Sequence, residues 1–536
     1  MEFNLADLWE RVVDTVPDHP AVVCDGRTLT YRQVDDRANR LAHSLSARGV
    51  GPGDHVALYL YNSAEYLEGM LASFKLRAVP INVNYRYVEE ELQYLLLDAD
   101  VKAIIFHREF APKLASISND LPLVRAYLAV DDGSEADLAA LGASEYETAV
   151  EAESPMRDFA PRSADDLYIL YTGGTTGMPK GVMWRHEDIF FGAFGGAGAG
   201  GAMISMPEEI AERCTESRLR CVPACPFMHG TAHWMAFSAL YAGGTVIVYT
   251  DRHFDPVHLW ELIARERANF LVIVGDAFAR PLHDALDEVD HLDLSDCHVI
   301  LSGGAILSPS VKHALADRLP ASLIVDGYGA SETGGQGQSV TVAGGDVPTS
   351  PRFNVNDETT VLGDDLRPAP PGVVGRLSRT GHIPLGYYKD PEKTAATFPE
   401  VDGVRWAVPG DHAVIEEDGT ITLLGRGSVS INTGGEKVYP EEVEAVLKSH
   451  PAVFDVVVVG VPDDRWGERV IAVVQPRPGE TPAVEALRAH SREHLAPYKL
   501  PREVVIVETV VRSPSGKPDY RWARSVAVEH LERAAL

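Results

Sequence analysis

The feature that most constrains the fold is a repeated alternation of helix-period segments with short apolar runs. Thr30 can cap a helix whose N3 residue is Gln33, and apolar residues then recur at helical spacing until Gly49 ends the helix. A strand is expected at residues 55–60, and the same order recurs with a helix at 87–97 and a strand at 101–106. This alternation predicts layers of helices and strands, an α/β fold class.

Four later apolar runs end abruptly in polar or glycine-rich turns. They span residues 167–171, 271–274, 299–301 and 323–325. In open α/β sheets, ligands bind beyond the carboxyl ends of the strands. We therefore expect these four ends to line one site.

The length and a change of pattern indicate two domains. A chain of 536 residues is too long for one ordinary core. From about residue 372 short alternating strands appear, with a hairpin turn at Asp418-Gly419, which predicts a small β-rich subdomain. After Gly425 a compact α/β unit begins again, with a helix opening at Pro440. We predict an N-terminal domain of residues 1–427 and a C-terminal domain of residues 428–536.

The composition is that of a globular chain and excludes several classes of function. Hydrophobic residues make up 45% and charged residues 24%, while the net charge of -30 would repel nucleic acid and anionic bilayers. The N-terminus is acidic and amphipathic, unlike a signal peptide, and no run of about eighteen apolar residues follows. We predict a cytoplasmic protein without an integral membrane segment or a nucleic-acid partner.

Two weaker motifs predict no chemistry. Residues 195–201 contain a formal G-x-G-x-x-G, but they lack a preceding strand and a capped helix, so a flexible loop is expected. Cys214, Cys221 and Cys225 cluster without a matching pair of Cys or His downstream. The odd number of cysteines, five in all, fits a reducing compartment, and zinc is not predicted.

Residues 171–181, YTGGTTGMPKG, form the strongest local signal and predict a phosphate-binding loop. Glycines allow close approach of the backbone, Thr172, Thr175 and Thr176 supply hydroxyls, and Lys180 adds a cation. A phosphate-loop kinase would need G-x4-G-K-[ST], and Pro179 stands where its second glycine should be. The loop is therefore a different kind of phosphate loop, and the alternative is a solvated glycine-rich turn without a ligand.

With this loop and its other motifs, the chain resembles the adenylate-forming superfamily of acyl-CoA synthetases, nonribosomal peptide adenylation domains and beetle luciferases. The further matches run in the superfamily's order and cover nearly the whole chain: GYGASET at 327–333, GYYKDPE at 386–392, GD at 410–411, GR at 425–426, GGEKVYPE at 434–441 and SPSGK at 513–517. The resemblance implies a large N-terminal domain, a mobile C-terminal domain and an active site between them.

The resemblance also assigns the reacting groups. Lys517 would bridge the substrate carboxylate and the α-phosphate, so that its charge stabilises the transition state of adenylation. Glu332 would be the carboxylate that holds Mg2+, which takes few protein ligands. His229 would lie between the acid pocket and the incoming thiol of coenzyme A.

The nucleotide is expected to lie against the phosphate loop and the later motifs. Tyr328 can stack on adenine, Asp411 can accept from ribose hydroxyls, and Arg426 can reach ribose or phosphate. The full predicted set is Thr172, Gly173, Gly174, Thr175, Thr176, Lys180, Gly304, Asp326, Tyr328, Ser331, Asp411 and Arg426.

The acyl pocket is predicted to be roomy and mostly apolar. No carboxylate follows residues 227–229, where amino-acid activators of the superfamily carry one. Asp276 is either a polar substrate contact or a loop cap, and the residues alone leave both readings open. The predicted pocket consists mainly of small residues: Trp234, Asp276, Gly303, Ala305, Gly329 and Ala330.

Three positions depart from the superfamily's pattern. Gly173 stands in place of the usual serine and removes a hydroxyl, and Ser331 stands in place of a threonine and keeps one. Ser428 is the expected hinge residue, where most members carry Asp or Lys.

The resemblance implies that ATP activates a carboxylic acid as acyl-AMP and that the acyl group passes to coenzyme A. Residues 171–191, 275–281 and 425–444 resemble actinobacterial ligases of fatty acids and steroid side-chain acids. Other acceptors stay open, namely a carrier protein, an amine, or nitrite in a diazotase-type reaction, as does a homodimer. A non-catalytic binding module would be expected to lack Lys517 or Glu332, and both are present.

Overall fold

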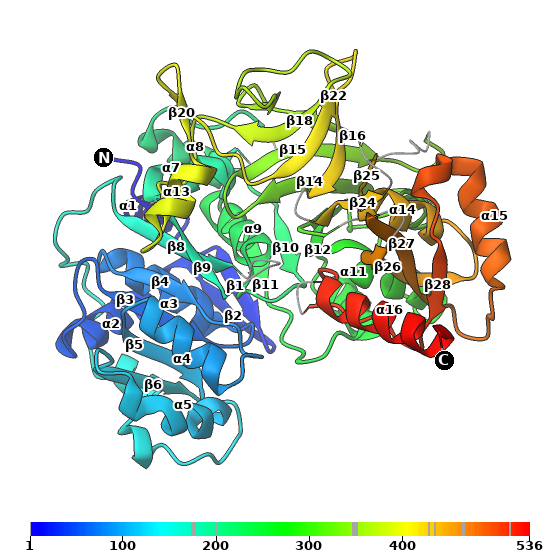
Figure 1. The fold of residues 1–536 in the computed structure, drawn as a ribbon. Helices are drawn as coiled ribbons and strands as arrows, with labels where there is room; N and C mark the ends of the chain where they lie inside the picture. The colour runs from blue at the N-terminus through cyan, green and yellow to red at the C-terminus, as the bar shows by residue number, and fades with distance from the viewer. Residues whose placement is uncertain are drawn as a thin grey trace.

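The computed structural model describes residues 2–172, 178–198, 201–305, 307–345, 352–426, 429–433, 436–463, 467–513 and 516–535. Its strands form two large sheets in the N-terminal part and a separate smaller sheet in the C-terminal part (Figure 1). The predicted α/β fold class, with a large N-terminal and a small C-terminal domain, is confirmed. In the part of the chain that the structure describes, no helix is long and apolar enough to cross a membrane.

The first large sheet has eight strands. It is parallel from β8 through β4, β3, β5 and β6 to β7, and antiparallel at β9 and β19. In sheet order the strands are β19 (Gly386–Tyr387), β9 (Lys180–Arg185), β8 (Leu167–Thr172), β4 (Val79–Asn82), β3 (His55–Tyr59), β5 (Val101–His107), β6 (Ala126–Val130) and β7 (Ser144–Glu145).

Successive side chains of these strands point to opposite faces, so each face needs its own cover. In β3, Val56 and Leu58 pack into one cluster of buried residues, while Ala57 and Tyr59 pack into another. The first cluster includes α2 (Tyr31–Ala47) and α3 (Ala64–Lys75), together with α6 (Tyr146–Glu151), and the second includes α4 (Glu89–Asp98) and α5 (Ala111–Ile117). The sheet is thus a buried layer between helices.

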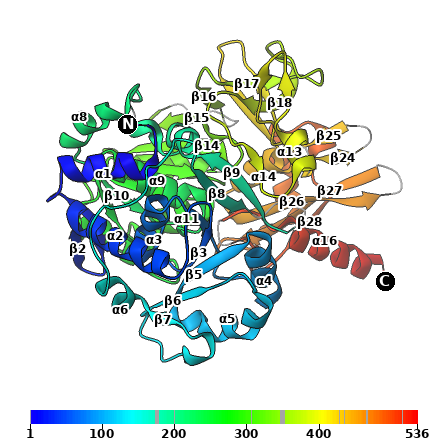
Figure 2. The same ribbon diagram turned by 90° about the vertical axis from the view of Figure 1, so that its left-hand side faces the viewer.

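The thirteen-stranded sheet is parallel in its centre and antiparallel in the β-rich part. Figure 2 shows the β-rich part, with β17 and β18, on one side of the molecule. In sheet order the strands are β17 (Thr359–Leu362), β18 (Val374–Arg379), β22 (Asp411–Ile415), β23 (Ile421–Arg426), β16 (Arg352–Val355), β15 (Gly334–Thr341), β14 (Leu323–Ala330), β13 (Val299–Gly303), β12 (Phe270–Ile273), β10 (Arg220–Pro223), β11 (Thr245–Ile247), β1 (Pro20–Cys24) and β2 (Arg27–Thr30).

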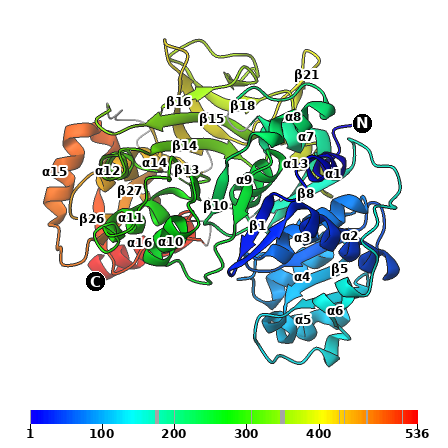
Figure 3. The same ribbon diagram turned by 180° about the vertical axis from the view of Figure 1, so that it is seen from behind.

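Helices cover the parallel part of this sheet, and Figure 3 shows several of them from behind. Their apolar residues form one continuous core with the strands. The helices are α1 (Leu5–Thr15), α7 (His186–Gly192), α8 (Ile210–Thr215), α9 (Gly230–Tyr241), α10 (Pro256–Arg265), α11 (Gly275–Ala285) and α12 (Pro309–Arg318). A short helix, α13 (Pro391–Thr397), and the hairpin of β20 (Glu400–Val401) and β21 (Val404–Arg405) follow β19.

The C-terminal domain has a five-stranded sheet with helices on both faces. One buried cluster contains residues of α14 and α15, and another contains residues of α16. Its elements are β24 (Ile431–Thr433), β25 (Glu436–Val438), α14 (Pro440–Lys448), β26 (Val453–Asp463), β27 (Gly467–Pro476), α15 (Val484–His494), β28 (Glu503–Ile506) and α16 (Tyr520–Ala535).

Several predicted elements are confirmed, and one expected turn is wrong. The capping box of α2 is complete, with Gln33 N donating to Thr30 Oγ1 and Thr30 N to Gln33 Oε1. The strand expected to end at residue 325 instead continues to Ala330 as β14, which pairs antiparallel with β15. The sequence DGYGA is therefore strand, because a partner from later in the chain satisfies its backbone groups.

Candidate active site

The loop that carries Lys517 lies against the N-terminal domain. Ser513 N donates to Lys517 O at 2.8 Å, and Lys517 N donates to Ser513 Oγ at 3.1 Å. A Cβ on Gly516, whose φ is +72°, would stand 3.3 Å from Val274 O, just beyond the end of β12. This close approach places the backbone next to Lys517 at the carboxyl end of β12.

His229 stands at the N-cap of α9, and the charge of Lys517, in the C-terminal domain, acts on it. Burial, and then the positive charge of Lys517, lower the pKa of His229 to about 3. The Nε2 atom is enclosed and has no hydrogen-bond partner among the described residues. His229 is therefore neutral in this orientation of the domains.

Asn82, at the end of β4, ties the phosphate-loop strand to the segment before His229. Its Nδ2 donates to Tyr171 O at 2.8 Å and to Met228 O at 2.7 Å, and its Oδ1 accepts from Tyr171 N at 2.7 Å. Sequence reasoning missed Asn82. The signal that could have found it is a polar amide ending a buried apolar strand.

The motif GYYKDPE contacts both Lys180 and Glu332. Its first residues form β19, which pairs with β9, the strand that follows the phosphate loop, and Lys180 forms an ion pair with Asp390. Tyr387 Oη donates to Glu332 Oε1 at 2.8 Å. Tyr387 and Asp390 thus contact two of the predicted site residues, and the sequence analysis assigned them no role.

The predicted nucleotide residues lie on the central strands and at the start of β22. Asp411 is buried after Gly410, and its backbone stands opposite Arg426 in the register of β22 and β23. Tyr328 packs against Phe353 with ring centroids 5.8 Å apart. Asp326 Oδ2 lies 2.6 Å from Lys312 Nζ, and burial raises the pKa of Asp326 to about 6.

Part of the predicted site lies outside the described residues. These positions are Gly173, Gly174, Thr175 and Thr176 of the phosphate loop, the hinge residue Ser428 and the side chain of Arg426. Their roles stay predictions, as does the exact domain boundary. Ser331 is described, and its carbonyl accepts from Trp184 Nε1 at 3.2 Å.

The predicted pocket residues fall into three groups. Gly303 and Gly304 both lie near Thr231. A Cβ on Gly303 would stand 3.6 Å from Thr231 Cγ2, and a Cβ on Gly304 would stand 3.1 Å from Thr231 Oγ1. Gly329 and Ala330 belong to β14, where a Cβ on Gly329 would stand 2.3 Å from Gly334 O. Ala305 is partly buried against the core.

A chain of hydrogen bonds orients Trp234. His233 Nδ1 must donate to Phe227 O at 2.7 Å, because a carbonyl only accepts, so the unprotonated Nε2 accepts from Tyr168 Oη. Tyr168 Oη in turn accepts from Trp234 Nε1 at 2.9 Å. His233 is therefore a buried structural histidine that supports the wall formed by Trp234.

Asp276 does not stand free in a pocket. Its Oδ1 accepts from Ser308 N at 2.8 Å, and its Oδ2 lies 3.3 Å from Lys448 Nζ of the C-terminal domain. Of the two readings left open by the sequence, this geometry favours the loop cap.

Three buried histidines predict a loss of stability in mild acid. Burial lowers the pKa values of His107, His186 and His233 to about 4. An unfolded histidine titrates near pH ~6.5, so below that pH the unfolded chain binds protons that the folded chain excludes. The free energy of unfolding should fall as the pH drops from ~6.5 towards 4, by about 1.4 kcal/mol per pH unit for each residue.

The measurement is the Tm at pH ~7.5 and ~5.5. His107→Asn should lessen the acid loss, because asparagine does not titrate. The asparagine carbonyl can still accept the hydrogen bond from Tyr61 N, so the fold should be kept. His291→Asn is the matched control, since the side chain of His291 is 66% exposed. An unchanged acid loss in His107→Asn would contradict the assignment.

The two domains, with the lysine loop of the second against the end of β12 of the first, make up a divided site. A family model described as AMP-binding enzyme matches residues 9–388, and one described as AMP-binding enzyme C-terminal domain matches residues 442–517. The chain belongs to the AMP-binding enzyme family.

Two proteins of similar sequence are named as acid–CoA ligases, and a solved structure of similar fold has ATP bound. A 3-oxocholest-4-en-26-oate–CoA ligase from Rhodococcus rhodochrous is 49% identical over 533 residues, covering 98% of this chain and 96% of the relative. A medium/long-chain-fatty-acid–CoA/3-oxocholest-4-en-26-oate–CoA ligase from Mycobacterium tuberculosis is 48% identical, covering 97% and 95%. The solved structure of ATP-bound MatB from Rhodopseudomonas palustris is 26% identical, with a TM-score of 0.80 over 98% of this chain and 99% of that one.

Proposed function

We propose that this protein is an AMP-forming acid–CoA ligase that activates a fatty acid or a steroid side-chain acid. The observation that carries the proposal is the close approach of Gly516, next to Lys517, to the end of β12, together with the effect of the Lys517 charge on His229. The Rhodococcus and Mycobacterium relatives, named as ligases of such acids, support it.

In the first half-reaction a carboxylate oxygen of the acid attacks the α-phosphorus of ATP. The new O–P bond forms as the bond to the β-phosphate breaks, and pyrophosphate leaves. The barrier is mainly one of positioning and charge, since two anions must meet. Lys517 would supply a cation where the carboxylate and the α-phosphate meet. Asn82 bonds to both Tyr171 and Met228 and so fixes the distance between the strand before the phosphate loop and the segment before His229.

Glu332 fits the role of the Mg2+ ligand. It is a single carboxylate beside the phosphate-loop strand, held by Tyr387, and Mg2+ needs few protein ligands. The bound ion would neutralise phosphate charge.

In the second half-reaction the thiol of coenzyme A attacks the acyl carbon, and AMP leaves. Rotation about Ser428 would withdraw Lys517 and bring residues 434–439 to the thiol channel. Because Lys517 helps to lower the pKa of His229, its withdrawal would make His229 easier to protonate.

The proposal is tested by a screen of acids with and without coenzyme A. Pyrophosphate release and acyl-CoA formation are measured for acetate, octanoate, palmitate, a steroid side-chain acid, a hydroxycinnamate and an aminobenzoate. We expect the highest kcat/KM on palmitate or the steroid acid, because burying apolar surface contributes about 0.8 kcal/mol per CH2. Highest activity on acetate or the aminobenzoate would overturn the choice of acid, and acid-dependent pyrophosphate release without acyl-CoA formation would overturn the acceptor.

Tyr387→Phe should weaken the apparent affinity for Mg2+, and so raise the half-saturating Mg2+ concentration, without abolishing activity. Loss of the hydroxyl leaves Glu332 without the hydrogen bond that orients it, and such supporting contacts typically affect metal affinity about 10- to 100-fold. The measurement is acid-dependent pyrophosphate release over a titration of Mg2+. Tyr127→Phe, on β6, is the control, and an unchanged half-saturating Mg2+ concentration in Tyr387→Phe would contradict the role.

A further inference from the structure

Asp276 and Lys448 form a buried ion pair between the two domains. Asp276 lies on α11 and Lys448 ends α14, with Nζ 3.3 Å from Oδ2, and both side chains are at most 5% exposed. Arg280, one turn further on α11, donates from Nη2 to Lys448 O at 3.2 Å. α11 lies beside the C-terminal domain in Figures 1 and 3. The last residue of α14 is therefore held by both its side chain and its backbone.

From Lys448 the contacts continue to the loop of Lys517. Lys448 Nζ lies 3.5 Å from Asp455 Oδ1 in β26. Arg512 donates to both oxygens of Asp455, from Nε at 2.5 Å and from Nη2 at 2.7 Å. Its Nη1 donates to Gly516 O at 2.9 Å, one residue before Lys517. A continuous series of charged groups thus links α11 to the catalytic lysine.

The series is sensitive to the loss of any one partner. Lys448 and Arg512 hold the pKa of Asp455 at about 2 in spite of its burial. Buried charges are costly unless they are paired, and removing one partner leaves the other with weaker compensation. Without Lys448, Asp276 would keep Arg280 Nη2 at 3.8 Å, and without Asp276, Lys448 would keep Asp455. When the C-terminal domain rotates away, Asp276 and Lys448 both regain water, so the pair favours one orientation without locking it.

We propose that Asp276 and Lys448 are positioning residues for adenylation. Their ion pair favours the domain orientation that presents Lys517, and through Asp455 and Arg512 it supports the backbone of Gly516. The inference rests on the proposed function, because it needs two half-reactions that require different orientations.

The test compares the two half-reactions in Asp276→Asn and Lys448→Met. Asparagine keeps the acceptor for Ser308 N and removes the charge. Acid-dependent pyrophosphate release should fall about tenfold or more, while thioester formation from preformed acyl-AMP should be retained or rise. Lys448→Arg, which keeps the charge, should restore most of the adenylation. Lys499→Met is the matched control, because Lys499 pairs with Glu442 inside the C-terminal domain.

The outcomes separate this inference from the proposed function. If the wild type releases no pyrophosphate with any acid, the proposed function fails. If the wild type is active and the variants lose both half-reactions equally, or neither, the positioning role is wrong. The double variant adds a check, since coupled residues should give a combined loss smaller than the sum of the two separate losses.

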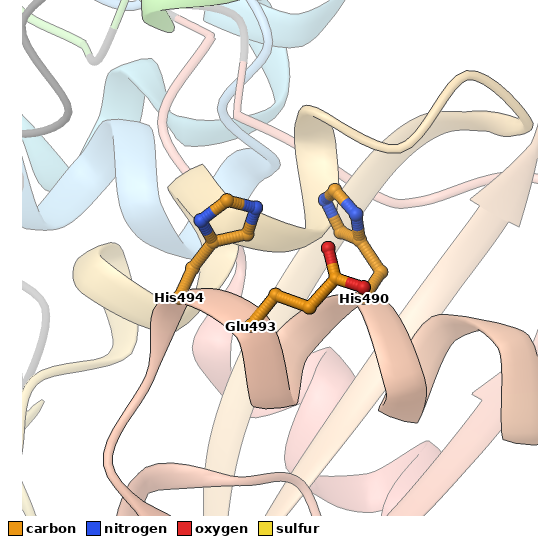
Figure 4. Close-up of side chains that lie close together, drawn as sticks. All are labelled: His490, Glu493 and His494. Carbon is orange, nitrogen blue, oxygen red and sulfur yellow. The ribbon is translucent and has the colours of Figure 1, made fainter.

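A second, independent cluster lies on α15, at the outer edge of the C-terminal domain. His490, Glu493 and His494 are spaced so that they share one face of the helix, and Figure 4 shows their side chains together. One ligand atom from each lies within 4.8 Å of the others. It is the one such group among the described residues, and it does not include Glu332.

The hydrogen bonds of His490 leave one ring nitrogen for a ligand. Its Nε2 lies 2.7 Å from Ser449 Oγ and 3.1 Å from Val446 O. Ser449 Oγ uses its own proton to donate to Val446 O at 2.7 Å, and a carbonyl only accepts, so Nε2 carries the proton. The lone pair is then on Nδ1. A histidine that donates its other N–H to a backbone carbonyl is the usual arrangement at metal sites.

We infer that this face binds Zn2+ through His490, Glu493 and His494. Zn2+ is intermediate between hard and soft metal ions, and imidazole nitrogens and carboxylate oxygens are among its usual ligands. Because the helix is exposed, water would complete the coordination and the ion would exchange.

The test is calorimetric titration of the full chain with Zn2+ in buffer saturated with Mg2+. One site is expected in the wild type, and His494→Ala and Glu493→Gln should each weaken it about tenfold or more. His291→Ala, at an exposed histidine away from the cluster, should leave it unchanged. No binding, or equal binding by His494→Ala, would overturn the site.

Discussion

Replacing Lys517 with alanine should reduce acid-dependent pyrophosphate release by about a hundred- to a thousandfold, the usual effect of removing one preorganised transition-state contact. Besides burial, the charge of Lys517 contributes to the low pKa of His229, and we propose that Lys517 stands where the carboxylate and the α-phosphate would meet. Thioester formation from preformed acyl-AMP should survive, because that step has no anion–anion encounter at the phosphate. The two half-reactions are measured separately on the same preparation.

A matched control distinguishes this effect from general damage to the C-terminal domain. Lys499→Ala removes a lysine of the same domain that pairs with Glu442, and both half-reactions should continue. If Lys517→Ala loses both half-reactions to the same degree, Lys517 supports the fold or the thiol step rather than adenylation.

Patterns among neighbouring residues were sufficient to predict much of the fold. The capping box of Thr30 and Gln33 involves neighbours in the chain, so its hydrogen bonds could be predicted directly. The hairpin of β22 and β23 closes where Asp418-Gly419 predicted it, and α14 begins at Pro440. Each of these depends on residues a few positions apart.

Long-range pairing explains what the sequence could not predict. Residues 326–330 look like a glycine-rich turn until β15 pairs with them. The contacts of Asn82 with Met228 and of Tyr387 with Glu332 span 146 and 55 residues, and no local pattern encodes such distances. Asp276 could not be placed for the same reason, since its partner Lys448 belongs to the other domain.

The glycines at and next to the predicted acyl pocket differ in what would prevent a larger residue from replacing them. At Gly329 a Cβ would stand 2.3 Å from Gly334 O, so the β14–β15 pairing itself demands glycine there. Gly304 has a φ of +86°, which side chains rarely adopt. At Gly303 a Cβ would meet its nearest neighbours, Gly327 O and the side chain of Thr231, at an ordinary 3.6 Å. Gly303 is therefore the position at which size can be changed without breaking the backbone.

Gly303→Val should shift the preference of the enzyme from bulky to small acids. Its Cβ fits, and the two added methyl groups would enter the space beside Thr231, where the acyl chain is proposed to lie. A change of pocket shape of this size typically alters kcat/KM by about 10- to 200-fold, so palmitate or the steroid acid should lose that much while acetate is nearly unaffected. Gly335→Ala, where a Cβ meets nothing within 4 Å, is the control for an added side chain. Equal losses of kcat/KM on all acids would mean that Gly303 is needed for the structure of the strand ends rather than for the size of the pocket. An unchanged preference would mean that the acyl chain does not lie beside Gly303.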